Sequence, residues 1–137
     1  MSDRTLRVVI LDSEGLAGVG RNDRVVAHRL AAARDNGQRV ILPAVVAAEV
    51  ITGGPTDVGV YRAMKRLIAE PISVDLAARA GQLRERAGRA RRKKRDLTVD
   101  AIVAAVAIAR APSVVLTADP DDLQLLTEGH DVRVIGL

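Results

Sequence analysis

Two acidic residues follow strand-like runs in this sequence. Asp12 comes after residues 7–11, and Asp119 comes after residues 113–118. We expect both at the carboxyl edge of a sheet, where open α/β sheets bind their ligands. Each has a structural alternative, since Asp12 can cap the following turn and Asp119 can cap a helix that begins with Pro120. The two roles are compatible, because one carboxylate oxygen can accept a backbone N–H while the other binds a metal.

Two further acids lie in otherwise apolar segments. Glu49 is the single charge in residues 44–51, and Asp100 precedes residues 101–109, which carry no charge. An isolated carboxylate buried in such surroundings is costly unless a cation meets it. The alternatives are that Glu49 reaches solvent or pairs with an arginine, and that a helix N-terminal dipole stabilises Asp100.

Together the four acids indicate a metal site. Four carboxylates that meet without cations repel one another and take up protons. Mg²⁺ and Mn²⁺ remove this conflict because they prefer oxygen ligands. Such a site can deprotonate a water and stabilise the leaving oxygen of a phosphodiester. His28 and His130 lie away from the acids in the pattern, so we exclude histidine general-base chemistry. The lack of cysteine excludes thiolate catalysis and disulfides.

Alternating strands and helices are needed to position these acids. The apolar patterns predict strands at residues 7–12, 40–43, 113–119 and 132–135, with 72–74 a short strand or an extended connection. Helices are expected at residues 22–36, 44–51, 57–69, 75–90, 99–110 and 120–127. The first helix should turn Val25, Val26, Leu30 and Ala33 toward the core, with Gly37 closing it. This order predicts a three-layer α/β/α fold with a mostly parallel central sheet of four to five strands.

Composition limits the class of protein. The 137 residues are 48% hydrophobic and contain no linker or repeat, so we expect a single domain over residues 1–137. Tyr61 is the only aromatic residue, so the core must be aliphatic. No apolar stretch reaches the roughly 18 residues of a membrane span, and the N-terminus does not resemble a signal peptide. We therefore expect a soluble cytoplasmic protein.

Basic residues gather in one segment. The net charge is +4, and residues 84–95 carry Glu85 as their only acid. A positive field of this kind attracts polyanions. We expect the segment to bind RNA phosphates, with a solvated loop as the alternative, and Arg62, Lys65 and Arg66 to assist it. The RNA-binding residues expected within it are Arg89, Arg91, Arg92, Lys93, Lys94 and Arg95.

The sequence around the four acids resembles that of the PIN-domain ribonucleases, in particular the VapC-like toxins of bacterial toxin–antitoxin pairs. Four pieces carry the resemblance in the family's order: VILDS at 9–13, LPAVVAAEV at 42–50, TVDAIVAA at 98–105 and LTADPDDL at 116–123. They extend over nearly the whole chain. Each piece is weak alone, and the four in order are fairly specific.

The resemblance implies a site and partners. It assigns Asp12, Glu49, Asp100 and Asp119 as the catalytic quartet that holds Mg²⁺ or Mn²⁺. Ser13 and Thr117 match hydroxyl residues that orient water or the carboxylates, and Asp121 and Asp122 are outer carboxylates. It also implies an endoribonuclease that forms homodimers and is blocked by a small antitoxin, often through an inserted arginine. The near absence of aromatic residues departs from this resemblance, because base stacking cannot then be a main source of RNA affinity.

Two other functions compete with this interpretation. A haloacid-dehalogenase-like phosphatase also uses a strand-end aspartate and a later threonine. It expects a second aspartate at position 14, where this chain has Glu14, and a late lysine that is lacking here. The non-enzymatic alternative is a catalytically silent PIN-like module that binds RNA or a protein. The presence of all four acids argues against it, and a metal titration without binding would revive it.

Overall fold

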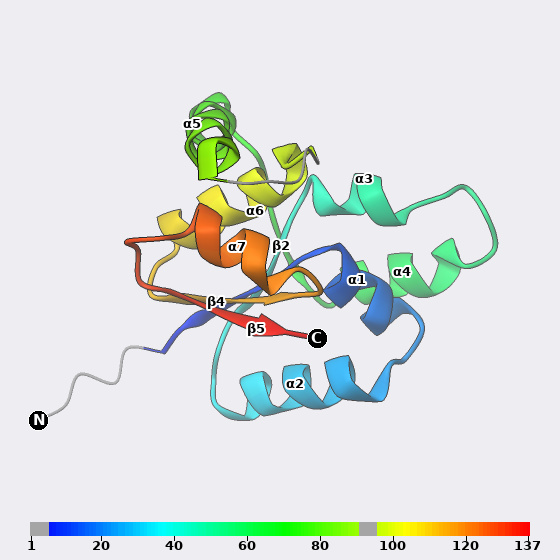
Figure 1. Ribbon diagram of the computed structural model, residues 1–137. Coiled ribbons are helices and arrows are strands. Elements are labelled where there is room, and N and C mark those ends of the chain that lie inside the picture. Colours follow the sequence, from blue (N-terminus) through cyan, green and yellow to red (C-terminus); the bar gives the residue numbers. More distant parts are fainter. Residues whose placement is uncertain (1–5, 91–95) are drawn as a thin grey trace, which may run out of the picture.

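A parallel sheet of five strands forms the centre of the molecule (Figure 1). The computed structural model describes residues 6–90 and 96–137. The strands are β1 (Val8–Leu11), β2 (Val40–Pro43), β3 (Ile68–Glu70), β4 (Ser113–Thr117) and β5 (Val132–Gly136). They lie in the order β3-β2-β1-β4-β5, and every neighbouring pair is parallel. The expected α/β fold with a mostly parallel sheet is therefore confirmed.

Helices cover both faces of the sheet. The helices are α1 (Ser13–Gly20), α2 (Arg24–Asp35), α3 (Val46–Val50), α4 (Asp57–Met64), α5 (Val74–Ala90), α6 (Thr98–Ala109) and α7 (Pro120–Leu126). Figure 1 shows α5, α6 and α7 on one side of the sheet and α2 on the other. Helices α1 and α4 lie beyond the end toward which β5 points, which is the carboxyl edge of the parallel strands. These elements therefore surround the edge at which ligands of such sheets bind.

The core is aliphatic, as the composition requires. The three central strands are buried almost throughout, with Ile10 and Val115 fully shielded from solvent. Helix α6 packs on them through buried small residues, including Ala101 and Ala104. Small side chains allow the backbone of α6 to lie close to the sheet, which places the first turn of that helix near the carboxyl edge. No helix within residues 6–90 or 96–137 has the length and apolar character needed to cross a membrane.

Helices α1 and α4 make a close backbone contact at two glycines. A Cβ atom added to Gly59 would lie 2.2 Å from the carbonyl oxygen of Gly20. Because that neighbour is backbone, no side-chain rotation relieves the clash. Helix α4 can therefore pack at this distance from α1 only if position 59 is glycine.

Hydrogen bonds fix the beginning of α6. The Asp96 carboxylate accepts both the backbone N–H and the hydroxyl of Thr98, at 3.0 and 2.7 Å. The Thr98 hydroxyl also accepts a hydrogen bond of 3.0 Å from Arg84 of α5. On the same helix, Arg86 donates to the carbonyl of Leu126 at 3.3 Å. Two residues of the basic segment thus connect α5 to its neighbours.

Several local predictions were wrong. Helix α1 was not predicted, and α4 ends at Met64 rather than near residue 69. The third strand lies at Ile68–Glu70, so the strand alternative for 72–74 was wrong. Residues 72–73 instead form part of a connection to α5, in agreement with the other alternative. The position of β3 depends on pairing with β2 at the edge of the sheet, and its exposed residues show no apolar pattern. Val25 was expected in the core but is 58% exposed, whereas Val26 is buried.

Candidate metal-binding acidic site

Asp12 connects the ends of two neighbouring strands. It follows β1 directly and is only 7% exposed. Its Oδ1 accepts the backbone N–H of Gly15 at 3.0 Å and so caps α1, as one alternative predicted. Its Oδ2 accepts the N–H of Ala118, one residue beyond β4, at 3.3 Å. The carboxylate is therefore held at the carboxyl edge by both of its oxygens.

The environment of Asp12 disfavours its charged form. Burial raises the pKa of Asp12 above its ordinary value of 3.8, although hydrogen bonds from Thr117, Gly15 and Ala118 act in the opposite direction. The nearby charge of Glu14 raises the pKa further. A positive charge beside the carboxylate would offset this cost.

Thr117 lies between two of the predicted acids. It is the last residue of β4 and is fully buried. Its side chain is hydrogen-bonded to the Asp12 carboxylate, and its Oγ1 accepts the backbone N–H of Asp119 at 2.9 Å. Thr117 therefore positions the Asp12 side chain and the backbone of Asp119 together.

Glu49 lies at the same edge but is not buried. Its side chain is exposed, and in the short helix α3 only Val46 is buried. The argument from burial was therefore wrong for Glu49, because α3 extends from the carboxyl edge instead of packing across the sheet. The hydroxyl of Ser13 donates a hydrogen bond to Oε1 of Glu49. This bond places Glu49 beside the residue that follows Asp12.

Asp100 lies in the first turn of α6, where the helix dipole favours a negative charge. The residue is half-buried, and its Oδ2 atom is shielded from solvent. The Asp96–Thr98–Arg84 hydrogen bonds two residues earlier hold this end of the helix.

Asp119 precedes α7, with Pro120 at the start of the helix as expected. Its carbonyl accepts the N–H of Leu123 at 3.3 Å, but its side chain makes no capping hydrogen bond. The predicted side-chain cap is thus not present, although the helix begins where it was expected. Asp121 and Asp122 lie in the first turn of α7, the former exposed and the latter half-buried.

The hydrogen bonds bring together part of the predicted quartet. Glu49 is bonded to Ser13, the residue after Asp12, and Asp119 is joined to Asp12 through Thr117. Within residues 6–90 and 96–137, no group of three or more Asp, Glu or His side chains is arranged so that it could hold a metal ion. The convergence of all four acids on one cation therefore stays a prediction.

The basic segment is described only in part. Arg89 is exposed near the end of α5, whereas Arg84 and Arg86 make the internal hydrogen bonds given above. The predicted contacts of Arg91, Arg92, Lys93, Lys94 and Arg95 lie outside the described residues. Sequence reasoning missed the Ala118 N–H, because a backbone donor gives no signal of a partner 106 positions away. It also missed the Asp96–Thr98 pair, which is local and could have been found from an aspartate two residues before a threonine at a helix start.

Solved structures that match this fold include VapBC and FitAcB complexes. The VapBC2 complex of Rickettsia felis with a promoter DNA fragment contains a chain that matches with a TM-score of 0.74 and 13% identity, over 95% of this chain and 98% of that chain. For DNA-bound VapBC of Salmonella typhimurium, the TM-score is 0.67 with 16% identity, over 96% and 98% of the two chains. For FitAcB of Neisseria gonorrhoeae, it is 0.61 with 19% identity, over 94% and 97%. At these identities the matches establish a shared fold.

Sequence comparison gives the family independently. A search against curated proteins finds no match. The family model of the PIN domain matches residues 15–126, a range that includes Glu49, Asp100 and Asp119 and begins just after Asp12. This match spans most of the chain, and the parallel sheet with acids at its carboxyl edge agrees with it. The chain therefore belongs to the PIN domain family.

Proposed function

We propose that this chain is a metal-dependent endoribonuclease that hydrolyses RNA phosphodiester bonds, and that it is the toxin of a toxin–antitoxin pair. The observation that carries the proposal is the buried Asp12 carboxylate, with its raised pKa, at the carboxyl edge of β1. Ser13 and Glu49 extend the same edge. Membership of the PIN domain family supports nuclease chemistry, and it removes the support for a haloacid-dehalogenase-like phosphatase.

The donor chemistry fits a hard divalent cation. Asp12, Glu49, Asp100 and Asp119 would hold it, and all four supply carboxylate oxygens, which suit Mg²⁺ or Mn²⁺. When bound, the cation supplies an activated water and stabilises the leaving oxygen of the phosphodiester. Affinity for the cation should rise with pH, because Asp12 must lose its proton to bind it.

The other polar groups at the edge serve as positioning residues. The Gly15 and Ala118 N–H groups and the Thr117 side chain orient the Asp12 carboxylate. Ser13 orients Glu49. Asp121 and Asp122 are candidate outer carboxylates on α7. None of these groups would have to supply a general base, because a bound cation would itself lower the pKa of a water.

The partners are proposed by analogy with the structural relatives. VapBC and FitAcB are the complexes in which matching chains occur, and the two VapBC complexes are bound to DNA. We infer for this chain an antitoxin partner, a homodimeric assembly and an RNA substrate in the cytoplasm. Arg89, which is exposed near the end of α5, is the described residue of the basic segment that we expect to contact RNA phosphates.

The test is cleavage of single-stranded RNA by the purified protein with Mn²⁺ or Mg²⁺. We expect the cleavage rate to fall by more than roughly 100-fold in Asp12→Asn and in Asp100→Asn. Loss of a residue that only hydrogen-bonds to a metal ligand typically costs roughly 10- to 100-fold, and loss of a ligand itself should cost more. EDTA should abolish cleavage. Glu128→Gln, an exposed acid-to-amide change after α7, is the matched control and should keep full activity. Undiminished cleavage by both aspartate variants would refute the site assignment.

One observation favours a second candidate, a catalytically silent PIN-like binding module. The described acids do not form a metal-binding group as they stand. Isothermal titration with Mn²⁺ separates the two proposals. Binding that Asp12→Asn weakens supports the nuclease, whereas no binding together with retained RNA affinity supports the silent module.

A further inference from the structure

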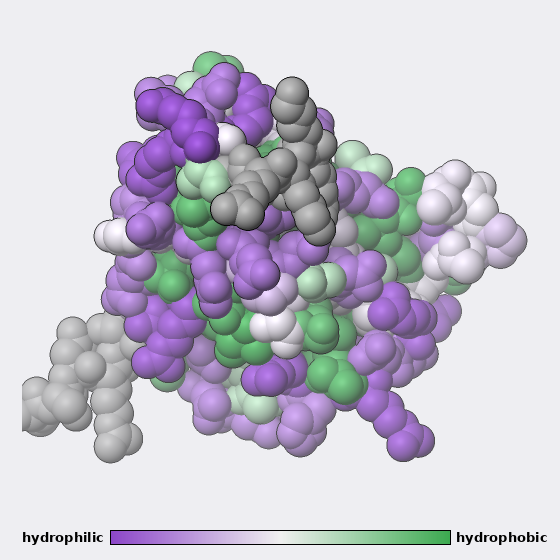
Figure 2. Space-filling view, viewed as in Figure 1, coloured by the Kyte–Doolittle hydropathy of each residue, from purple (hydrophilic) through white to green (hydrophobic). Residues whose placement is uncertain are grey.

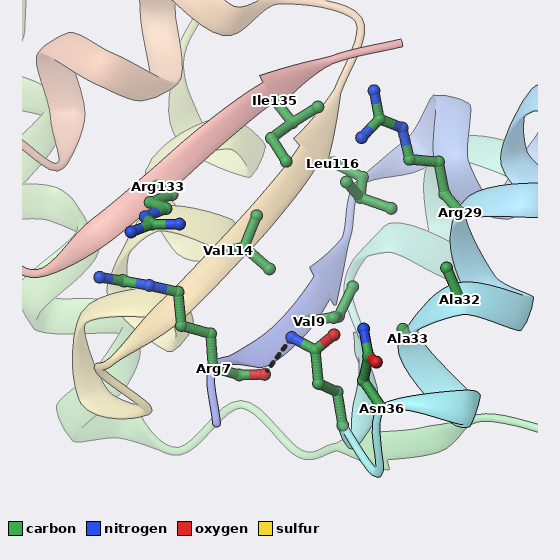
Figure 3. Close-up of a pocket in the computed structure, with 11 residues that line it drawn as sticks. Arg7, Val9, Arg29, Ala32, Ala33, Asn36, Val114, Leu116, Arg133 and Ile135 are labelled. Atoms are coloured by element: carbon green, nitrogen blue, oxygen red, sulfur yellow. Dashed lines mark hydrogen bonds between the residues drawn. The ribbon is translucent and has the colours of Figure 1, made fainter. Parts of the chain in front are cut away.

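A cavity of about 220 Å³ opens on the sheet face that α2 covers, away from α5, α6 and α7 (Figures 1 and 3). Its floor is apolar and comes from three strands: Val9 of β1, Val114 and Leu116 of β4, and Ile135 of β5. Helix α2 packs against β2 and leaves the β4 and β5 side of this face open. Figure 2 shows hydrophobic surface around β5 and the C-terminus, bordered by hydrophilic residues.

Arginines stand on opposite sides of this floor. Figure 3 shows Arg29 of α2 on one side and Arg133 of β5 with Arg7 on the other. Arg7 is neutralised by Asp131, at 2.7 Å. Arg29 and Arg133 are exposed, and neither has an acidic partner within ion-pair distance in the part of the chain that the structure describes. The cavity therefore presents two uncompensated guanidinium groups above an apolar surface, a combination suited to an anionic ligand with an apolar body.

Two further hollows lie between the cavity and the carboxyl edge of the sheet. The first shares Arg29 and Ala32 with the cavity and extends along the outer side of α2 to Val25. The second also contains Val25 and is lined by Ala118, whose N–H is bonded to Asp12. Arg21 lines this second hollow together with Glu14 and Asp23, and each of these carboxylates lies 3.7 Å from its guanidinium group. Successive hollows thus share lining residues, from Ala118 at the carboxyl edge to Arg29 at the cavity, and we call this series of hollows the path.

We propose that this path binds single-stranded RNA that flanks the cleavage site, with one nucleotide seated in the cavity. This inference rests on the proposed nuclease function, because it concerns where the RNA substrate binds beyond the acidic edge. The base and ribose contact the apolar floor, and phosphates contact Arg29 and Arg133. A strand rises about 3.3 Å per residue, so Val114 is roughly 10 Å from Thr117 at the edge, a span that a short flanking segment covers. The near absence of aromatic residues is no obstacle, because guanidinium planes also stack on bases.

A matched pair of charge variants tests the path. Ala32 and Ala31 are neighbouring exposed residues of α2, and only Ala32 lines the cavity. Ala32→Glu places a carboxylate at the cavity mouth, and Ala31→Glu makes the same charge change outside it. Binding of a fluorescein-labelled single-stranded RNA is measured by anisotropy in EDTA, so that no cleavage intervenes. We expect Ala32→Glu to weaken binding about tenfold and Ala31→Glu to change it less than about twofold.

Arginine variants measure the number of phosphate contacts. Arg29→Ala and Arg133→Ala should each lower the slope of log affinity against log salt concentration by roughly 0.7, the value for one phosphate on a single strand. Arg34→Ala removes an exposed arginine of α2 outside the cavity and should leave the slope unchanged. Thermal melts of all variants show that each remains folded.

Two results would overturn the proposal. One is an equal effect of Ala32→Glu and Ala31→Glu on RNA affinity. The other is displacement of the RNA by a polyglutamate peptide. If this peptide itself binds tightly and its affinity falls in the Ala32→Glu variant, the cavity binds an acidic protein segment instead of RNA. RNA binding is measured without metal, so it does not depend on cleavage. If Ala32→Glu weakens RNA binding more than Ala31→Glu does, but the protein cleaves no RNA with any metal, the RNA path stands and only the nuclease function is refuted.

Discussion

At the residue scale, Asp12 shows how the fold can bury a carboxylate so that its charged form is disfavoured. Backbone N–H groups of Gly15 and Ala118 hold its two oxygens, and the Thr117 side chain adds a third hydrogen bond. These bonds only partly offset the loss of hydration, so the pKa of Asp12 stays raised. A divalent cation supplies the missing charge, which is why this residue is central to the proposed function.

Asp57 is a second buried carboxylate, and its environment has the opposite effect. It is 6% exposed and accepts the backbone N–H groups of Thr52 and Gly53, at 3.0 and 2.6 Å, and the hydroxyl of Thr52 at 3.1 Å. Hydrogen bonds from the Thr52 and Gly53 backbone lower the pKa of Asp57 below 3.8. The charged carboxylate therefore stabilises the folded state above the unfolded pKa, and this stability is lost as pH falls through the lower folded-state pKa.

We therefore predict that Asp57→Asn lowers the free energy of unfolding at neutral pH, and that the difference from the unaltered chain shrinks as pH falls below 3.8. Urea unfolding at a series of pH values measures both effects. Glu85→Gln, an exposed change in the middle of α5, should alter neither. The prediction fails if the free energy of unfolding of Asp57→Asn differs from that of the unaltered chain by the same amount at every pH. The charge of Asp57 would then not be what stabilises the folded state.

At the scale of elements, the contact between α1 and α4 determines how the carboxyl edge is enclosed. The Gly59 position lies against the Gly20 carbonyl. Position 81 of α5 is also a helical glycine, but a Cβ atom there meets nothing within 4 Å. The two glycines thus differ in packing while sharing the same backbone freedom.

We predict that Gly59→Ala destabilises the protein by about 1–3 kcal/mol or more, because α4 must move away from α1. Gly81→Ala should instead stabilise it by roughly 0.5–1 kcal/mol through lower unfolded-state entropy. Denaturant unfolding of the two variants gives both values. Equal shifts in the same direction would mean that helix propensity, and not the α1–α4 approach, decides position 59.

At the scale of the whole molecule, the proposed metal connects segments that are distant in sequence. Asp12 follows β1, Asp100 lies in the first turn of α6 and Asp119 precedes α7. A ligand that binds the folded state alone adds RT ln(1 + [L]/Kd) to its stability. A cation held by these acids should therefore stabilise the entire fold.

We predict that Mn²⁺ at about one hundred times its Kd adds roughly 2.7 kcal/mol to the free energy of unfolding and raises Tm accordingly. Asp100→Asn should remove most of this increase, and Glu128→Gln should leave it intact. Differential scanning calorimetry with and without EDTA provides the measurement. Stabilisation of the same size in both variants would place the cation elsewhere on the protein.

Local patterns determined much of the fold and where the acids lie along it. Buried strands such as β1 and β4 consist of continuous apolar runs, because parallel strands covered on both faces require them. The acids that end these runs were therefore correctly placed at strand ends. Helix α6 was equally clear, since its apolar residues extend around most of the helix.

Tertiary contacts decided what remained. Strand β3 is exposed at the edge of the sheet and forms only because β2 offers it a partner, so no local pattern marks it. The exposure of Glu49 follows from the direction in which the short helix α3 leaves the sheet. The contact of Asp12 with Ala118 joins residues more than a hundred positions apart. Periodicity reports which side of an element is apolar, whereas such pairings depend on where the whole chain brings its elements together.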